Sequence, residues 1–225
     1  MPSDLTAQST QADFSLYLSA SKVVDSSHPE IVDFANERTS TAASTLDKAI
    51  ALYYAVRDEL RYDPYSIEMT ENGLAASTTL ASKTGWCVTK AVLFAATCRV
   101  IGVPARLGFA DVKNHLSTSN LRKSMGTDIF YWHGYTDVYL NGQWVKATPA
   151  CNVELCEKFR IKPLEFDGSA DSIYHPFDLD GRQHMEYVNY RGEYADVPIE
   201  EMISDFKRYY PNLLLVSSAD AKRHD

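Results

Sequence analysis

Residues 85–99, GWCVTKAVLFAATCR, predict a cysteine at the first turn of a buried helix. Gly85 allows a tight approach to that helix, and the rest of the stretch contains few strong charges. Gly102 and Pro104 are typical of a helix end, so we expect the helix to span Cys87–Ile101. A thiol in its first turn lies beside unpaired backbone N–H groups and the positive end of the helix dipole, which favour the nucleophilic thiolate. The alternative is a structural cysteine, because free cysteine packs as a small hydrophobic residue.

The composition is that of an acidic globular protein. The 225 residues are 45% hydrophobic and 23% charged, which suits one large domain with a substantial core. The net charge of −8 disfavours binding to nucleic acid or to an anionic membrane. No apolar run approaches the span of a bilayer or resembles a signal peptide, and four cysteines do not suggest a disulfide framework. We therefore expect a cytoplasmic protein with no nucleic-acid or membrane partner.

A hairpin is the best-defined piece of the chain. The alternating segment Ile129–Leu140 meets a type I′ turn at Asn141-Gly142, and Gln143–Thr148 returns. A two-residue turn fixes the register, and the predicted opposite pairs are Tyr139 with Trp144, Asp137 with Lys146, and Tyr135 with Thr148. Because side chains alternate along a strand, His133 shares a face with Tyr135 and Thr148.

The other expected elements are less sharply defined. Pro29–Arg38, Thr45–Leu60 and Leu74–Ser82 are predicted helices, and Ala105–Ala110 is a predicted strand. Residues 111–128 are expected to form a long polar connection. A second hairpin is predicted from Met185–Asn189 and Glu193–Val197, followed by a helix from Pro198 to about Tyr209. Residues 14–18 are expected to pack as a short arm or strand, whereas the first ten residues and the tail from Ser217 are expected to be loose.

A helix-start cysteine and a strand histidine suit nucleophilic acyl transfer. Cys87 would attack a carbonyl, and His133 would give a proton to the leaving amine. The oxyanion needs donors, for which the backbone N–H of Cys87 and the indole N–H of Trp86 are candidates. Further candidates for substrate contact are Tyr135, Asn114 and His115, although a loop histidine is also commonly a solvated residue.

Two sequence blocks resemble the transglutaminase-like superfamily. The first is Gly85-x-Cys87 with its helix and Gly102-Val103-Pro104-Ala105-Arg106. The second is His133-Gly134-Tyr135-Thr136-Asp137-Val138-Tyr139 followed by Trp144-Val145. This resemblance covers about residues 56–148 and implies an α+β, papain-like fold with the cysteine on a helix packed against an antiparallel sheet. It also implies a cysteine hydrolase or acyltransferase acting on amide-type groups. We expect one domain over residues 1–225, with a motif-bearing core of about 45–150 and a C-terminal extension of 151–215.

The chain departs from the family pattern at the third catalytic position. The family usually has an acidic residue four positions after the hairpin tryptophan, and this sequence has Thr148 there. A hydroxyl can orient an imidazole ring but cannot neutralise its positive charge. Asn152 and Asp167 are alternative residues for orienting His133.

Several functional alternatives remain open at this stage. The dyad could process a small-molecule or peptide amide, it could act on another acyl substrate in small-molecule metabolism, or the domain could be a binding scaffold that has lost activity. No cofactor is expected, since the chain has no glycine-rich phosphate loop. No metal is expected either, because Cys151 and Cys156 lack zinc-site spacing and the acidic segment 167–180 lacks EF-hand spacing.

Overall fold

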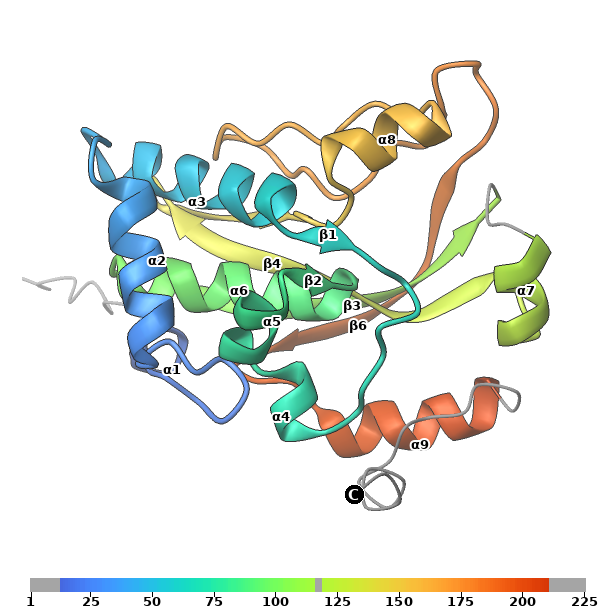
Figure 1. Ribbon diagram of the computed structural model, residues 1–225, viewed down its shortest axis with the longest axis horizontal. Coiled ribbons are helices and arrows are strands. Elements are labelled where there is room, and N and C mark those ends of the chain that lie inside the picture. Colours follow the sequence, from blue (N-terminus) through green and yellow to red (C-terminus); the bar gives the residue numbers. More distant parts are fainter. Residues whose placement is uncertain (1–12, 116–118, 211–225) are drawn as a thin grey trace, which may run out of the picture.

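The computed structural model describes residues 13–115 and 119–210, which form a mixed helix and strand fold (Figure 1). A four-stranded antiparallel sheet has the order β5-β4-β3-β6. Its strands are β3 (Ala105–Asn114), β4 (Ile129–Leu140), β5 (Gln143–Ala147) and β6 (Met185–Tyr194). Two short strands, β1 (Arg61–Tyr62) and β2 (Thr84–Gly85), pair in parallel just before the cysteine helix. The predicted α+β class is confirmed.

Helix α6 packs directly against β3 and β4 of this sheet (Figure 1). Helices α2, α3 and α5 in turn pack on α6, while α9 packs on β4. The helices are α1 (Ser15–Leu18), α2 (Pro29–Thr39), α3 (Thr45–Glu59), α4 (Glu71–Leu74), α5 (Ala76–Ser82), α6 (Cys87–Val100), α7 (Ser119–Met125), α8 (Val153–Phe159) and α9 (Ile199–Tyr209). None of those in the described ranges has the length and apolar character needed to span a bilayer.

The central helix α6 is buried on all sides, as its sequence predicts. Every residue from Cys87 to Arg99 is buried, including Lys90, which has no exposed surface. The Lys90 ammonium group donates to the carbonyls of Arg57 and Leu60 at 2.8 and 2.7 Å, and burial lowers its pKa to about 7. These bonds fasten the end of α3 to the first turns of α6.

The hairpin turn and its predicted register are confirmed up to Ala147, but the predicted pair of Tyr135 with Thr148 is not part of the ladder. Tyr139 pairs with Trp144 and Asp137 with Lys146, as the two-residue turn requires. The structure adds a partner that the sequence did not indicate, because Arg106 of β3 forms the ion pair with Asp137 at 2.7 Å. The paired ladder stops at Ala147, which lies opposite Thr136, so Thr148 lies just beyond the end of β5.

The predicted long loop and second hairpin are wrong. Strand β3 continues to Asn114, and α7 occupies part of the expected loop at 119–125. Met185–Tyr194 is one continuous strand, β6, paired with β3 along its length. Two of the polar residues that suggested a loop and a turn, Asp111 and Arg191, lie at β-bulges, where the register with a neighbouring strand shifts by one residue.

The predictions for the two ends of the chain are tested only at residues 15–18. Residues 15–18 form the short helix α1 rather than a strand. The expectations for the first ten residues and for the tail from Ser217 concern segments outside the described residues.

Buried side chains from α2 to α9 join in one hydrophobic cluster. The proposed division into a core and an extension within one domain stays a prediction.

Candidate active site

The N-terminus of α6 meets β4 where β5 has ended. Because β5 pairs with β4 only as far as Thr136, no described strand pairs with β4 on that edge at His133 and Gly134. A Cβ atom on Gly134 would lie 2.9 Å from the Cα of Val88, so only glycine permits this approach. The close packing brings the His133–Gly134 backbone against the first turn of α6.

Cys87 lies in this junction as the first residue of α6 and is 7% exposed. Burial raises the pKa of its thiol to about 11, although nearby backbone N–H groups, chiefly that of Gly134, oppose the rise. The expectation of a resting thiolate is therefore corrected. Desolvation of the charged form outweighs the favourable N–H groups at the helix start.

His133 is 4% exposed and lines the same pocket as Cys87. Burial lowers the pKa of its imidazole to about 4, so the ring is neutral near pH 7. Its Nε2 atom is buried without a hydrogen-bond partner among the described residues. The indole Nε1 of Trp86, in the same pocket, is likewise buried without such a partner.

Thr148 lines a second pocket that His133 also lines. Its backbone is fixed, because its N–H donates to the carbonyl of Ser172 at 2.9 Å. Its hydroxyl oxygen is buried beside the hydroxyl of Tyr187, and within the described part of the chain no well-formed hydrogen bond reaches it. Tyr187 of β6 lies nearby with its ring 6.3 Å from that of His133, edge to face, and among the described residues its hydroxyl also lacks a well-formed hydrogen bond. No local sequence signal marked Tyr187 as a neighbour of the site.

The two alternative orienting residues are occupied by other contacts. Asn152 accepts from the backbone N–H of Tyr62 at 3.2 Å and donates to Glu154 at 2.6 Å. Asp167 accepts from the backbone N–H and hydroxyl of Ser169 at 2.8 and 2.7 Å. Neither lines the two pockets that His133 shares.

The remaining candidates for substrate contact lie elsewhere on the sheet. Tyr135 is fully buried over Gly108, and its hydroxyl donates to Glu193 at 3.3 Å. Asn114 ends β3, and the His115 ring pairs with Glu186 of β6 at 3.3 Å. None of the three lines the pockets that contain Cys87 or His133.

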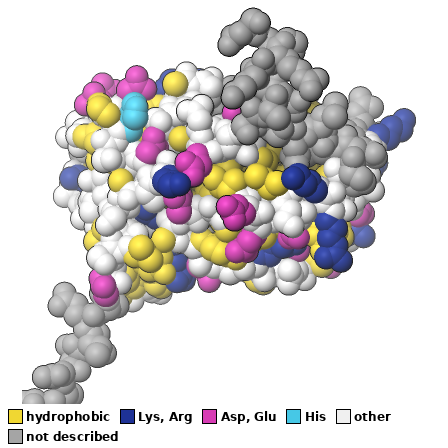
Figure 2. Space-filling view, turned by 90° about the horizontal axis from the view of Figure 1, so that it is seen from below, with side chains coloured by type: hydrophobic (Ala, Val, Ile, Leu, Met, Phe, Trp, Pro, Cys, Tyr) yellow, Lys and Arg dark blue, Asp and Glu magenta, His cyan; other side chains and the backbone are white. Residues whose placement is uncertain are grey.

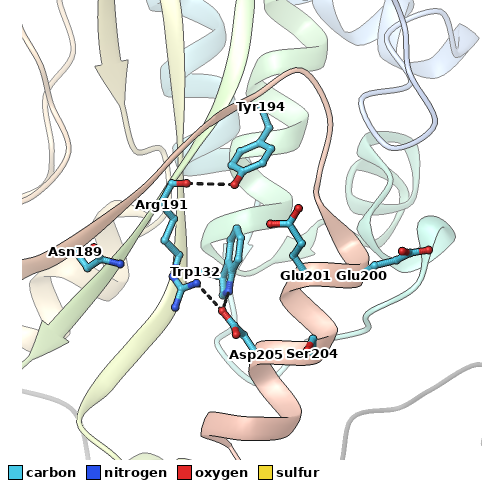
Figure 3. A pocket seen from close by; sticks show the side chains of 8 residues that line it. All are labelled: Trp132, Asn189, Arg191, Tyr194, Glu200, Glu201, Ser204 and Asp205. Atoms are coloured by element: carbon cyan, nitrogen blue, oxygen red, sulfur yellow. Dashed lines mark hydrogen bonds and ion pairs between the residues drawn. The ribbon is translucent and has the colours of Figure 1, made fainter.

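A charged network holds the residue that precedes His133 (Figure 3). Trp132 has a left-handed backbone (φ 59°), which is costly for a residue with a side chain. Its backbone N–H donates to Asp111 at 3.2 Å and its indole N–H to Asp205 of α9 at 2.9 Å. The Arg191 guanidinium bridges the two carboxylates and lies 4.5 Å from the Trp132 ring.

Three β-bulges surround Asp111. On one side, β4 has an extra residue between the partners of Ala110 and Val112, where Trp132 lies. On the other side, β6 has extra residues at Arg191 and Val188. Asp111, 5% exposed, accepts from groups on both neighbouring strands and so satisfies polar groups that the bulges leave unpaired.

The described residues contain no group of three or more histidine, cysteine or acidic side chains arranged to hold a metal ion. Cys151 and Cys156 both have free thiols and line the pocket that holds Thr148.

Two solved structures and one family profile are similar to this chain. A proposed cysteine protease from Cytophaga hutchinsonii is 16% identical, with a TM-score of 0.49 over 81% of this chain and 55% of its own. A proposed protease from Parabacteroides distasonis is 20% identical, with a TM-score of 0.37 over 52% of this chain and 22% of its own. The chain thus spans about half the length of the first of these structures. A search of curated protein sequences found no match. The family profile of the transglutaminase-like superfamily matches residues 32–149, so the chain belongs to that superfamily.

Proposed function

We propose that this protein is a cysteine-dependent acyl-transfer enzyme that acts on an amide-type substrate. One observation carries the proposal: Cys87 and His133 come from different elements and line one pocket. The backbone N–H of Gly134 beside the thiol favours negative charge on its sulfur. Membership in the transglutaminase-like superfamily supports cysteine-based hydrolase or acyl-transfer chemistry at this site.

The reaction begins from a neutral pair. Because burial raises the pKa of Cys87 and lowers that of His133, neither group is charged near neutral pH. His133 takes the thiol proton as the Cys87 sulfur forms a bond to the carbonyl carbon. The carbon–nitrogen bond then breaks, and His133 gives the proton to the leaving amine. Water or a second amine resolves the thioester, giving hydrolysis or transfer.

The oxyanion of the tetrahedral intermediate has two donors at hand. The Trp86 indole N–H is buried in the Cys87 pocket and, among the described residues, donates to nothing. The backbone N–H of Cys87 lies in the first helical turn, where no carbonyl within the helix accepts it. Unused buried donors are costly in a resting protein, so their position beside the nucleophile supports this role.

Thr148 occupies the third position of the triad in this proposal. Its unpaired hydroxyl shares a pocket with His133, and a hydroxyl can accept a hydrogen bond from the ring. It cannot stabilise an imidazolium ion as a carboxylate does. We therefore expect slower catalysis than a full triad supports, on a small-molecule or peptide amide.

A binding domain without catalytic activity is the second candidate function. The observation in its favour is that no carboxylate bonds to His133 among the described residues. This reading predicts a thiol that reacts no faster than other buried cysteines.

Alkylation by iodoacetamide separates the two candidates. At pH 7.5 we expect Cys87 to react faster than Cys98, which is fully buried inside α6, and His133→Ala to slow Cys87 by about tenfold or more. Peptide mass spectrometry reports each cysteine separately, so Cys98 and Cys151 are internal controls. Equal rates for Cys87 and Cys98, unchanged by His133→Ala, would remove the catalytic proposal.

A further inference from the structure

A β-bulge places Tyr187 of β6 on the same face of the sheet as His133. On the central strand β3, Ala110 lies opposite His133 and Val112 lies opposite Tyr187. Because Ala110 and Val112 are two positions apart, they and their partners face one side of the sheet. The extra residue Val188 produces this register. Without it, Tyr187 would lie opposite the next residue of β3 and would face the other side.

The shared face brings the rings of Tyr187 and His133 into contact across β3. Their centroids lie 6.3 Å apart and their planes are perpendicular, which is the edge-to-face arrangement that ring pairs favour. Ala110 is fully buried beside them, and its small methyl group leaves the two rings room to approach. Tyr174 and Tyr190 pack against the Tyr187 ring at 4.8 and 5.5 Å. The ring of Tyr187 is therefore held in place by several aromatic contacts.

The hydroxyl of Tyr187 reaches the residue at the third catalytic position. It lies beside the hydroxyl of Thr148, and both oxygens are buried. Burial raises the pKa of Tyr187 well above its ordinary value, so the hydroxyl keeps its proton near neutral pH and can donate it. A threonine oxygen has two lone pairs. If Tyr187 donates to one of them, the other can accept from the His133 ring.

No charged side chain orients the His133 ring in the described part of the chain. Burial alone accounts for the low pKa of this imidazole, and no carboxylate acts on it. Asn152 and Asp167 are held by other contacts, to Tyr62 and Ser169. The orienting contacts therefore have to come from neutral groups.

Burial of its hydroxyl distinguishes Tyr187 from aromatic residues of the outer surface. Figure 2, seen from the side of α9, shows a band of hydrophobic side chains bordered by acidic and basic ones. Tyr190 of β6 is 59% exposed, and single exposed side chains of this kind are common on proteins. A buried tyrosine hydroxyl, in contrast, usually has a hydrogen-bond partner. The Thr148 hydroxyl beside it fits that need.

We propose that Tyr187 is a positioning residue for His133, acting through the Thr148 hydroxyl and through the contact of the two rings. The proposal rests on the acyl-transfer function and adds a residue from outside the family match at 32–149. In the resting site the three groups lie close together without well-formed hydrogen bonds. The chain Tyr187–Thr148–His133 closes as the ring takes the proton of Cys87. It orients the ring without supplying negative charge.

Alkylation of Cys87 by iodoacetamide at two pH values tests this role. Tyr187→Phe keeps the ring and removes only the hydroxyl. At pH 7.5 the thiolate forms by proton transfer to His133, so this variant should label Cys87 about fivefold more slowly than the unchanged protein. Burial raises the pKa of the Cys87 thiol to about 11. At pH 10 hydroxide ionises the thiol without the histidine, and the two rates should agree.

Tyr190→Phe is the matched control, because it removes an exposed hydroxyl from the same strand. It should leave the rate at Cys87 unchanged at both pH values. Circular dichroism at each pH shows whether the variants are folded. If Tyr187→Phe slowed labelling equally at pH 7.5 and pH 10, its hydroxyl would only support the fold, and the proposal would be overturned.

A double-mutant cycle shows whether the effect passes through Thr148. Thr148→Val should also slow labelling about fivefold at pH 7.5. The double variant should be no slower than either single one, because both changes break the same contact. Independent effects would multiply to about 25-fold, and that result would disprove a route through Thr148.

The proposed function and this role can fail separately. If His133→Ala slows labelling while Tyr187→Phe behaves like Tyr190→Phe, Tyr187 does not position the histidine and the acyl-transfer function stands. If His133→Ala leaves the rate unchanged, the acyl-transfer function fails, and nitrogen-15 NMR of the His133 ring decides the contact alone. Ring-nitrogen signals that shift in Tyr187→Phe and Thr148→Val but not in Tyr190→Phe support the contact, and unshifted signals overturn it.

Discussion

The backbone that carries His133 and the ring of His133 lie in opposite polar environments. On the backbone side, the carboxylates of Asp111 and Asp205 accept from the backbone and indole N–H groups of Trp132, and both pair with Arg191. On the ring side, His133 Nε2 is buried without a partner in the described structure, and the neighbouring hydroxyls of Thr148 and Tyr187 have no well-formed hydrogen bond.

The fold thus holds the backbone at His133 in place but gives the His133 ring few hydrogen bonds. A buried polar group without a hydrogen bond costs about 1–3 kcal/mol, so the ring side lowers stability while the backbone side supports it. A bound substrate or a water molecule could complete the ring side. The protein therefore fixes the position of the histidine and leaves the partners of its ring to the reaction.

Removing Asp111 should have the largest effect, because its carboxylate holds both the backbone of Trp132 and the guanidinium of Arg191. Asp111→Ala leaves Arg191, whose side chain is 14% exposed, without one of its two carboxylate partners, and it leaves the N–H of Trp132 unpaired. We expect a loss of about 4 kcal/mol in the free energy of unfolding, measured by urea titration. The control is Asp180→Asn, which removes surface ion pairs with Arg160 and Arg182 and should cost less than about 1 kcal/mol. Equal losses would show that the network does not hold the bulge.

Lowering the pH should destabilise the protein, because the buried His133 ring takes up a proton less readily in the folded chain than in the unfolded chain. The pKa of His133 is about 4 in the folded chain against an ordinary 6.5, so between these pH values only the unfolded chain binds the proton. Stability is therefore lost as pH falls from 6.5 to 4, by roughly 3 kcal/mol for this group. Urea titrations at pH 7 and pH 4 measure the loss, which should be smaller in His133→Gln. An identical loss in that variant would mean that other groups cause the acid sensitivity.

A carboxylate at position 148 should give the His133 ring a charged partner. Thr148→Asp raises the pKa of His133 and favours proton transfer from Cys87, so iodoacetamide should label Cys87 about tenfold faster at pH 7. Thr148→Val, which has the same shape without the hydroxyl, should not accelerate labelling. A folded Thr148→Asp protein with an unchanged rate would show that residue 148 does not act on the histidine.

The elements that bring Cys87 and His133 together could be predicted because their signals are local. Gly102 and Pro104 mark the end of α6, and Asn141-Gly142 fixes the register of the hairpin. The same local reasoning failed for β3 and β6. Asp111 and Arg191 read as loop and turn residues, yet they are partners 80 positions apart inside a bulged sheet.

Most residues around Cys87 and His133 could not be predicted from local sequence patterns either. Phe206 of α9, which lines the Cys87 pocket, was missed because an amphipathic helix shows the same pattern whether it covers a core or a binding site. The sequence predicted the position of Thr148 on the histidine side of the hairpin, and the shared pocket agrees with it. It could not indicate that Asn152 is held by Tyr62 and Glu154, because these contacts depend on the path of the chain around α8.

The bulges of β6 also bear on how the protein behaves among its own copies. β6 is an edge strand of the sheet, and it exposes Val188 and Tyr190, which are 54% and 59% accessible. A regular edge with such side chains would invite a strand from a second molecule to add to the sheet. The extra residues at 188 and 191 interrupt the even spacing that such an addition needs. The irregularity that pairs Arg191 with Asp111 thus also makes this edge a poor template for a strand from a second molecule.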